Sequence, residues 1–120
     1  MQTEFEFTLP VGYLDQNGAL HKQGVMRMAT AMDEILPLRD ARVRTNQAYL
    51  AIVLLARVVV RLGALPAIST TIIETLFAAD LSFLQSLYVS VNETGKTTVT
   101  VTCPHCQTDH EVDLAELGGA

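Results

Sequence analysis

The longest apolar stretch of the chain, residues 49–65, is the feature that most constrains the fold, because it holds two arginines, Arg57 and Arg61. A membrane-spanning helix needs roughly 20 apolar residues and tolerates a charge near its centre poorly. We therefore interpret the stretch as a buried helix and expect no membrane insertion. Its apolar residues follow helical spacing, and Gly63 is expected to end the helix in the left-handed conformation. Arg57 and Arg61 would then lie on one helix face.

A β-hairpin is predicted over residues 3–28. The segment Glu4–Leu9 alternates polar and apolar residues, which is typical of a half-buried strand. Asn17-Gly18 predicts a type I′ turn, because both central positions of that turn need positive φ. Pro10 and Gly12 indicate a bulge or an edge position in the first strand.

A short helix is expected to begin after Thr30. Thr30 can cap it, and the carboxylates of Asp33 and Glu34 would lie in its first turn, where they favour the positive end of the helix dipole. Pro37 should end it. Because Asp33 and Glu34 are adjacent and point in different directions, we interpret them as capping residues and not as a catalytic acid–base pair.

Further helix starts are expected at Asp40 or Thr45, which would open the helix that ends at Gly63, and at Ser69. Asp80 is interpreted as the N-cap of the last helix. The apolar face predicted for that helix comprises Leu81, Leu84, Leu87, Tyr88 and Val91.

The end of the chain predicts a second hairpin over residues 96–114, because residues 96–102 alternate Thr and Val and a short returning strand follows. We thus expect one α+β domain over residues 1–120. It would comprise an N-terminal hairpin (3–28), a central bundle of three to four helices (30–92) and this C-terminal hairpin. The sequence leaves open whether the two hairpins share a sheet.

The turn of the second hairpin contains Cys103-Pro-His-Cys106, which has the spacing of a zinc knuckle. A closed zinc site needs four ligands, so His110 or His105 would be the third and His21 the fourth. Two chains could instead supply one cysteine pair each. The alternative is an ordinary tight turn with two thiols. A thiol–disulfide redox role fits less well, since such dithiols begin a helix in a βαβ unit and this motif lies between strands.

No sequence pattern indicates catalysis. The chain has no phosphate-binding glycine loop, no nucleophile elbow and no metalloprotease motif. We therefore expect a non-enzymatic protein that works by binding other proteins.

The composition agrees with a binding role. The formal net charge is −5, which disfavours nucleic acid and anionic membrane surfaces as partners. Hydrophobic residues make up 49% and charged residues only 18% of the chain. A small domain with so few charges is expected to cover apolar surface with a partner, in an oligomer or a hetero-complex. Arg57 and Arg61 are candidate partner-binding residues that could hold a carboxylate. Alternatively they pair with the protein's own Glu74 or Asp80.

Residues 5–92 show a pattern of turns and helix faces carried by Phe7-Thr8-Leu9-Pro10, Gly12-Tyr13, Asn17-Gly18, Arg27-Met28-Ala29-Thr30-x-x-Asp33-Glu34 and Ile73-Glu74-x-Leu76-Phe77-x-x-Asp80-Leu81-x-x-Leu84. This pattern resembles the small tail assembly proteins of contractile phages, including the tail assembly chaperones of Mu-like phages. The cysteine-containing tail lies outside the pattern.

The resemblance implies an assembly factor, or a minor baseplate or hub component, of a contractile tail or a related injection system. Its partners would be other tail or baseplate proteins. They would bind the helical face around residues 45–90, and the N-terminal hairpin would offer an edge strand for β-augmentation. Because the first residues show neither a basic nor an apolar segment typical of a secretory signal, we expect the protein in the cytoplasm of a bacterial host or incorporated into a particle. The alternative is a zinc-binding adaptor that uses Cys103 and Cys106, across a dimer if needed.

Overall fold

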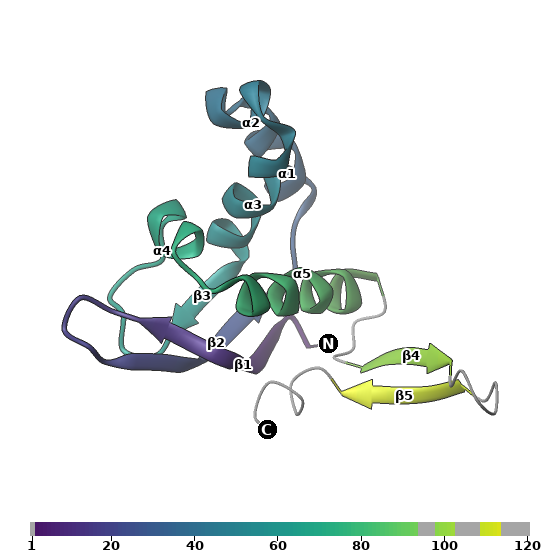
Figure 1. The fold of residues 1–120 in the computed structure, drawn as a ribbon. Helices are drawn as coiled ribbons and strands as arrows, with labels where there is room; N and C mark the ends of the chain where they lie inside the picture. Colours follow the sequence, from purple (N-terminus) through teal and green to yellow (C-terminus); the bar gives the residue numbers. More distant parts are fainter. Residues whose placement is uncertain (1, 94–97, 103–108, 114–120) are drawn as a thin grey trace.

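The computed structural model describes residues 2–93, 98–102 and 109–113 (Figure 1). The chain is α+β and begins with an antiparallel β-hairpin, as the sequence predicts. The strands of the first sheet are β1 (Glu4–Leu14), β2 (Leu20–Arg27) and β3 (Val59–Leu62). The helices are α1 (Ala31–Ile35), α2 (Ala41–Thr45), α3 (Leu50–Val58), α4 (Thr70–Glu74) and α5 (Ala78–Glu93), with 3₁₀ turns η1 (Leu36–Arg39) and η2 (Gln47–Tyr49).

The hairpin turn is set one residue earlier than expected. Strand pairing ends at Leu14 and Leu20, and the Gly18 N–H donates to the Asp15 carbonyl at 3.1 Å. The prediction of a type I′ turn centred on Asn17-Gly18 is therefore wrong. The physical reason is the Asp15 side chain, whose Oδ1 accepts the N–H groups of Asn17 and Ala19 at 2.9 Å each and so fixes a longer loop.

The expected bulge and edge position in the first strand are both confirmed. β1 lies at one edge of the sheet, whose strand order is β1-β2-β3. The register between β1 and β2 shifts between Thr8 and Tyr13. Gly12, in this segment, has a φ of 109°, a conformation that residues with a Cβ rarely adopt. The bulge therefore depends on glycine at this position.

The apolar stretch over residues 49–65 is not one helix. α3 ends at Val58, and Val59 has strand dihedrals and pairs with Met26 of β2. The prediction of a helix that runs to Gly63 was wrong because Val59 and Val60 are β-branched and are accommodated in a strand that pairs with β2. Gly63 still follows the element with a φ of 54°. The sheet thus gains a third strand inside the apolar stretch.

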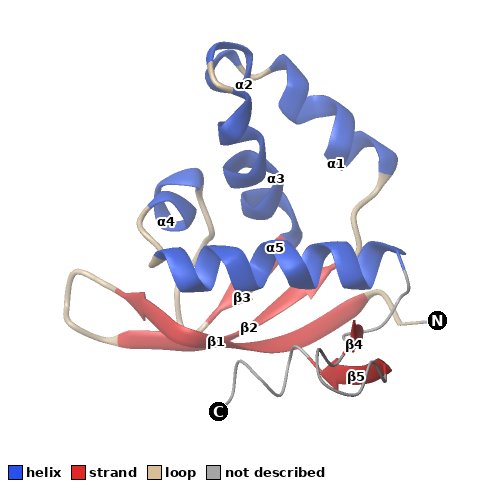
Figure 2. Cartoon of the chain, turned by 45° about the vertical axis from the view of Figure 1, so that its right-hand side comes forward, coloured by secondary structure: helices blue, strands red, loops and turns tan. Residues whose placement is uncertain are grey.

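The helices do not form one bundle, in contrast to the expectation. α5 lies along one face of the sheet, whereas α1, α2 and α3 rise away from that face as an arm (Figure 2). α3 runs directly into β3, so the arm is continuous with the sheet. Within the described residues, no helix has the length and apolar character needed to cross a membrane.

The core lies between the sheet and α5 and extends to α3 and α4. Leu84, Leu87 and Val91 of α5 are buried, and Leu81 and Tyr88 pack at the edge of the core, as predicted for this face. Phe7 of β1 and Phe83 of α5 are in contact, with ring centroids 6.3 Å apart. The other buried apolar residues include Phe5, Leu9, Met26, Leu55, Val58, Val59, Leu62, Ile73 and Leu76.

Helices begin after Thr30, Asp40 and Ser69, as predicted. The helix that follows Asp40 is not the one expected to run to Gly63, however, because α2 ends at Thr45 and α3 begins at Leu50. Thr30 forms a capping box with Asp33, since each side chain accepts the backbone N–H of the other residue. Asp40 caps α2 and Ser69 caps α4. Pro37 limits α1 to five residues by opening η1.

A second antiparallel sheet contains β4 (Thr98–Thr102) and β5 (Asp109–Asp113). Their register pairs Thr98 with Asp113 and Thr102 with Asp109. The hairpin predicted over residues 96–114 lies partly outside the described residues. Its turn with Cys103, His105 and Cys106 is wholly outside them.

Candidate functional site

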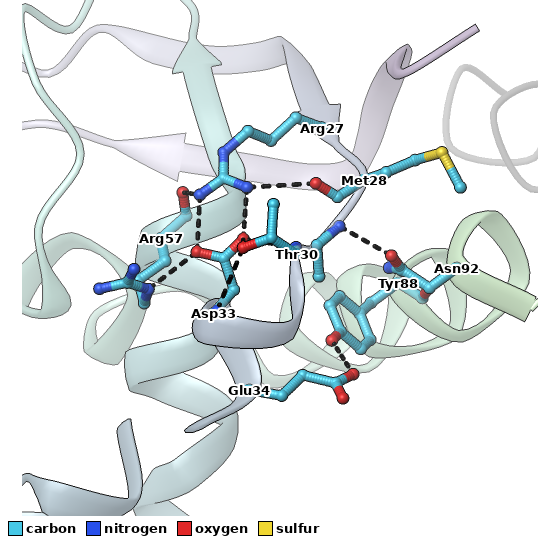
Figure 3. Close-up of polar contacts among 9 residues, drawn as sticks. Arg27, Met28, Thr30, Asp33, Glu34, Arg57, Tyr88 and Asn92 are labelled. Carbon is cyan, nitrogen blue, oxygen red and sulfur yellow. Dashed lines mark hydrogen bonds and ion pairs between the residues drawn. The ribbon is translucent and has the colours of Figure 1, made fainter. Parts of the chain in front are cut away.

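Arg57, a candidate for partner binding, lies in the last turn of α3 and contacts a buried carboxylate (Figure 3). Its Nε donates to Asp33 Oδ1 at 3.0 Å. Arg27 of β2 holds the same carboxylate through two hydrogen bonds, of 2.5 Å from Nη1 and 2.9 Å from Nη2. Arg27 Nη2 also donates to the Arg57 carbonyl at 3.1 Å. One carboxylate therefore joins β2, α1 and α3.

Asp33 is only 2% exposed. Its pKa lies well below the usual range, chiefly because Arg27 hydrogen-bonds to the charged form, while burial acts in the opposite direction. The Thr30 backbone N–H and hydroxyl also donate to Asp33 Oδ2, at 2.7 and 3.0 Å. The Asp33 carboxylate is thus ionised, and both of its oxygens accept hydrogen bonds from other residues of the domain.

The two predicted partner-binding arginines are not brought together on a helix face. Arg57 pairs with Asp33, and not with Glu74 or Asp80 as the sequence alternative proposed. Arg61 lies in β3, opposite Val25, and is exposed. Glu74 instead accepts a hydrogen bond from the Tyr49 hydroxyl.

Asp80 has a different role from the expected N-cap. The Phe77 carbonyl accepts the first hydrogen bonds of α5, from the N–H groups of Asp80 and Leu81. Asp80 is fully buried, and its two oxygens accept the N–H groups of Val11 and Gly12 at 2.9 Å each. The β1 bulge exposes these two amides and the Asp80 carboxylate satisfies them, so α5 is fixed to the sheet at this point.

Some of the predicted metal ligands lie outside the described residues, and others lie within them. Cys103 and Cys106 lie outside the described residues, and His110 lies in β5. His21 is used by the first hairpin: its Nε2 is 2.8 Å from Asp15 Oδ2, and its Nδ1 accepts the Ala64 N–H at 3.2 Å. Among the residues that the structure describes, no group of three or more metal-binding side chains occurs.

An apolar hollow of about 480 Å³ lies at the corner between α3 and α5. Its walls come from one face of η2 and α3 and from three residues of α5. One of these, Val89, is 49% exposed. The lining residues are Gln47, Ala48, Leu50, Ala51, Leu54, Leu55, Gln85, Tyr88 and Val89.

A second hollow of about 540 Å³ continues the first along the arm, because Gln47 and Leu50 line both. Its other lining residues are Leu38, Val43 and Arg44. Leu38 is 53% exposed. We call the two hollows together the arm–α5 groove. Its chemistry suits an apolar partner surface with one cationic contact, from Arg44.

Most of the groove lies within residues 45–90, whose helical face the sequence predicted as a binding surface. The hollow itself was not predicted, nor was the part lined by Leu38, Val43 and Arg44. The local signal is the excess of apolar residues over residues 47–55 beyond what one buried face needs. The corner itself arises from the packing of α3 near α5, which sequence spacing does not reveal. No protein-family model, curated protein or solved structure matches the chain.

Proposed function

We propose that the chain is a non-catalytic assembly factor, or a minor baseplate or hub component, of a contractile phage tail or a related injection system. It would bind another tail protein until that protein is assembled. The proposal combines the resemblance of residues 5–92 to tail assembly proteins with a surface suited to protein binding.

The arm–α5 groove is the observation that carries the binding part of the proposal. Its first hollow has a size typical of ligand and peptide pockets, and its wall is predominantly apolar. Val89 and Leu38 remain about half exposed there. Exposed apolar surface next to a concave wall is typical of protein-binding sites.

Co-purification tests the proposal. The tagged chain is expressed together with tail tube, hub and tape-measure proteins from the same source genome. We expect one of them to co-purify, and the Val89→Glu substitution to abolish the complex because it places a charge in the groove. Val60→Glu is the matched control, since Val60 is similarly exposed, at 46%, but lies in β3 outside the groove. A chain that remains alone with every tail protein refutes the assembly role.

A zinc-binding adaptor is the alternative function. It is favoured by the pairing of Thr102 with Asp109, because Cys103 and Cys106 then belong to the connection between two paired strands. Metal analysis of chain purified without added zinc tests it. The adaptor role requires about one zinc per chain, or per two chains if a dimer shares the site, and loss of that zinc in Cys103→Ser. A metal content near zero removes this alternative.

A further inference from the structure

The described arginines fall into two groups. Arg27 and Arg57 pair with Asp33, and Arg42 pairs with Asp40 at 2.8 Å. Arg39, Arg44 and Arg61 are exposed, and no acidic side chain of the described residues lies within ion-pair distance of them. Three of the six arginines therefore have no acidic partner within the described part of the fold.

Arg44 is the unpaired arginine that lines the arm–α5 groove, at the end of α2. Arg39 directly follows Leu38, which lines the same hollow. Arg61 lies in β3 and lines neither hollow. The groove is thus apolar along α3 and α5 and cationic at its α2 end.

The charge of this region is opposite to that of the whole chain. The arm, residues 31–58, holds four arginines and three acids, whereas the formal net charge of the chain is −5. Two of those acids, Asp33 and Asp40, are already paired with arginines, and Glu34 accepts the Tyr88 hydroxyl. The two arginines of the arm that remain without an acidic partner among the described residues, Arg39 and Arg44, are exposed, and Arg44 lines the groove.

We propose that the arm–α5 groove binds an acidic amphipathic helix of a partner protein. The helix would place its apolar stripe against Leu50, Leu54 and Val89, and carboxylates at one end beside Arg44. Gln47 and Gln85 can accept or donate hydrogen bonds at the wall. An Arg–carboxylate contact at the end of an apolar groove fixes the direction of the bound helix as well as its affinity.

The inference rests on the proposed function, because it names the chemistry of the partner that the groove would hold. It goes beyond that function in predicting which charges the partner carries and at which end of the groove they lie.

A displayed library of amphipathic helical peptides tests the inference. Each peptide has about 18 residues with a fixed apolar stripe at i, i+3, i+4 and i+7. The two positions next to the stripe at each end are varied over acidic, basic and neutral residues. The full chain is the bait, and the affinities of the selected peptides are measured by fluorescence anisotropy.

We expect selected peptides to carry Asp or Glu at one end only. Arg44→Glu should weaken their binding by about five- to tenfold, since it replaces attraction by repulsion at a partly exposed contact. It should also shift the selection toward Lys and Arg at that end. Arg61→Glu is the matched control and should leave affinity unchanged. Val89→Glu should abolish binding of every selected peptide.

Selected peptides without an acidic preference, or equal effects of Arg44→Glu and Arg61→Glu, overturn the inference. So does a library that gives no binder, or a chain that forms dimers lost on Val89→Glu, because the occupant is then a second copy. If a tail protein co-purifies in a manner that needs Val89 but not Arg44, the proposed function stands and the inference falls. If acidic peptides bind but no tail protein does, the inference stands and the proposed function falls.

Discussion

Asp33 holds three separate parts of the chain together, because its carboxylate contacts arginines from β2 and α3 and caps its own helix. A buried carboxylate in this position does more for the fold than an exposed ion pair, since its removal leaves two guanidinium groups without their partner. The Asp40–Arg42 pair offers a comparison in the same chain. It also combines a helix cap with an ion pair, but it is exposed.

Asp33→Asn is therefore expected to lower the free energy of unfolding by about 2–3 kcal/mol, because the charge is lost while the side-chain shape remains. Asp40→Asn should lower it by less than about 1 kcal/mol, as is usual for exposed pairs. Urea unfolding of both variants at pH 7 measures the difference. Equal effects would show that the Asp33 network contributes no more than a surface pair.

The Asp33 pair also predicts a pH dependence. Arg27 holds the folded-state pKa of Asp33 below its value in the unfolded chain, about 3.9. The stabilisation is then complete above the unfolded-state pKa and is lost as the pH falls through the folded-state pKa. We expect the difference in unfolding free energy between wild type and Asp33→Asn to be constant from pH 7 to about pH 5 and to shrink below about pH 4. Urea titrations at pH 7, 5 and 3 measure it. A constant difference down to pH 3 would contradict the assignment.

At the scale of elements, α5 depends on a contact that joins residues far apart in the chain. Asp80 satisfies the amides of Val11 and Gly12 in the β1 bulge. Sequence alone could identify both halves, since Pro10 and Gly12 predicted the bulge and Asp80 was recognised as a residue at a helix start. It could not join them, because no local pattern links positions separated by nearly seventy residues.

Asp80→Ala is expected to lower the free energy of unfolding by about 2–4 kcal/mol, because it leaves two buried or half-buried N–H groups unsatisfied. Amide hydrogen exchange at Val11 and Gly12 should accelerate at the same time. Ser82→Ala, at an exposed position of the same helix, serves as the control and should change neither quantity. If exchange at the two amides stays slow in Asp80→Ala, the bulge holds its shape without the carboxylate.

The β2–β3 pairing depends on Gly24. A Cβ at this position would lie 2.5 Å from the Arg61 carbonyl oxygen and 2.5 Å from the Phe7 ring. Gly24→Ala should therefore lower the unfolding free energy by about 2–3 kcal/mol, because a backbone atom cannot move aside as a flexible side chain can. Gln23→Ala, its exposed neighbour, should have little effect in the same thermal or urea unfolding measurement. Comparable losses in both would indicate that β3 adapts without strain.

Over the whole molecule, the hairpin, the helix caps and the buried face of α5 were predictable because each follows from local chemistry. Thr30, Asp40 and Ser69 each satisfy N–H groups within a few residues. The strand β3 was missed, and the binding face predicted around residues 45–90 did not reveal the hollow between α3 and α5. In a run as apolar as residues 49–65, a buried strand and a buried helix have the same sequence pattern. Only the pairing of β3 with β2 distinguishes them.

The described core cluster draws its residues from positions 5–91. We therefore expect a chain that ends at Glu93 to unfold cooperatively, with a free energy of unfolding within about 1 kcal/mol of the full chain. Circular dichroism during urea unfolding measures both. A truncated chain that fails to fold would show that residues after Glu93 complete the core.

The direct passage from α3 into β3 has a mechanical consequence. Val59 ends the helix and begins the strand at once, so no loop separates the arm from the sheet. A force on the arm would be transmitted to the hydrogen bonds between β3 and β2, because no flexible loop lies between the arm and the sheet. A protein bound to the arm would thus be held at a constant angle to the sheet.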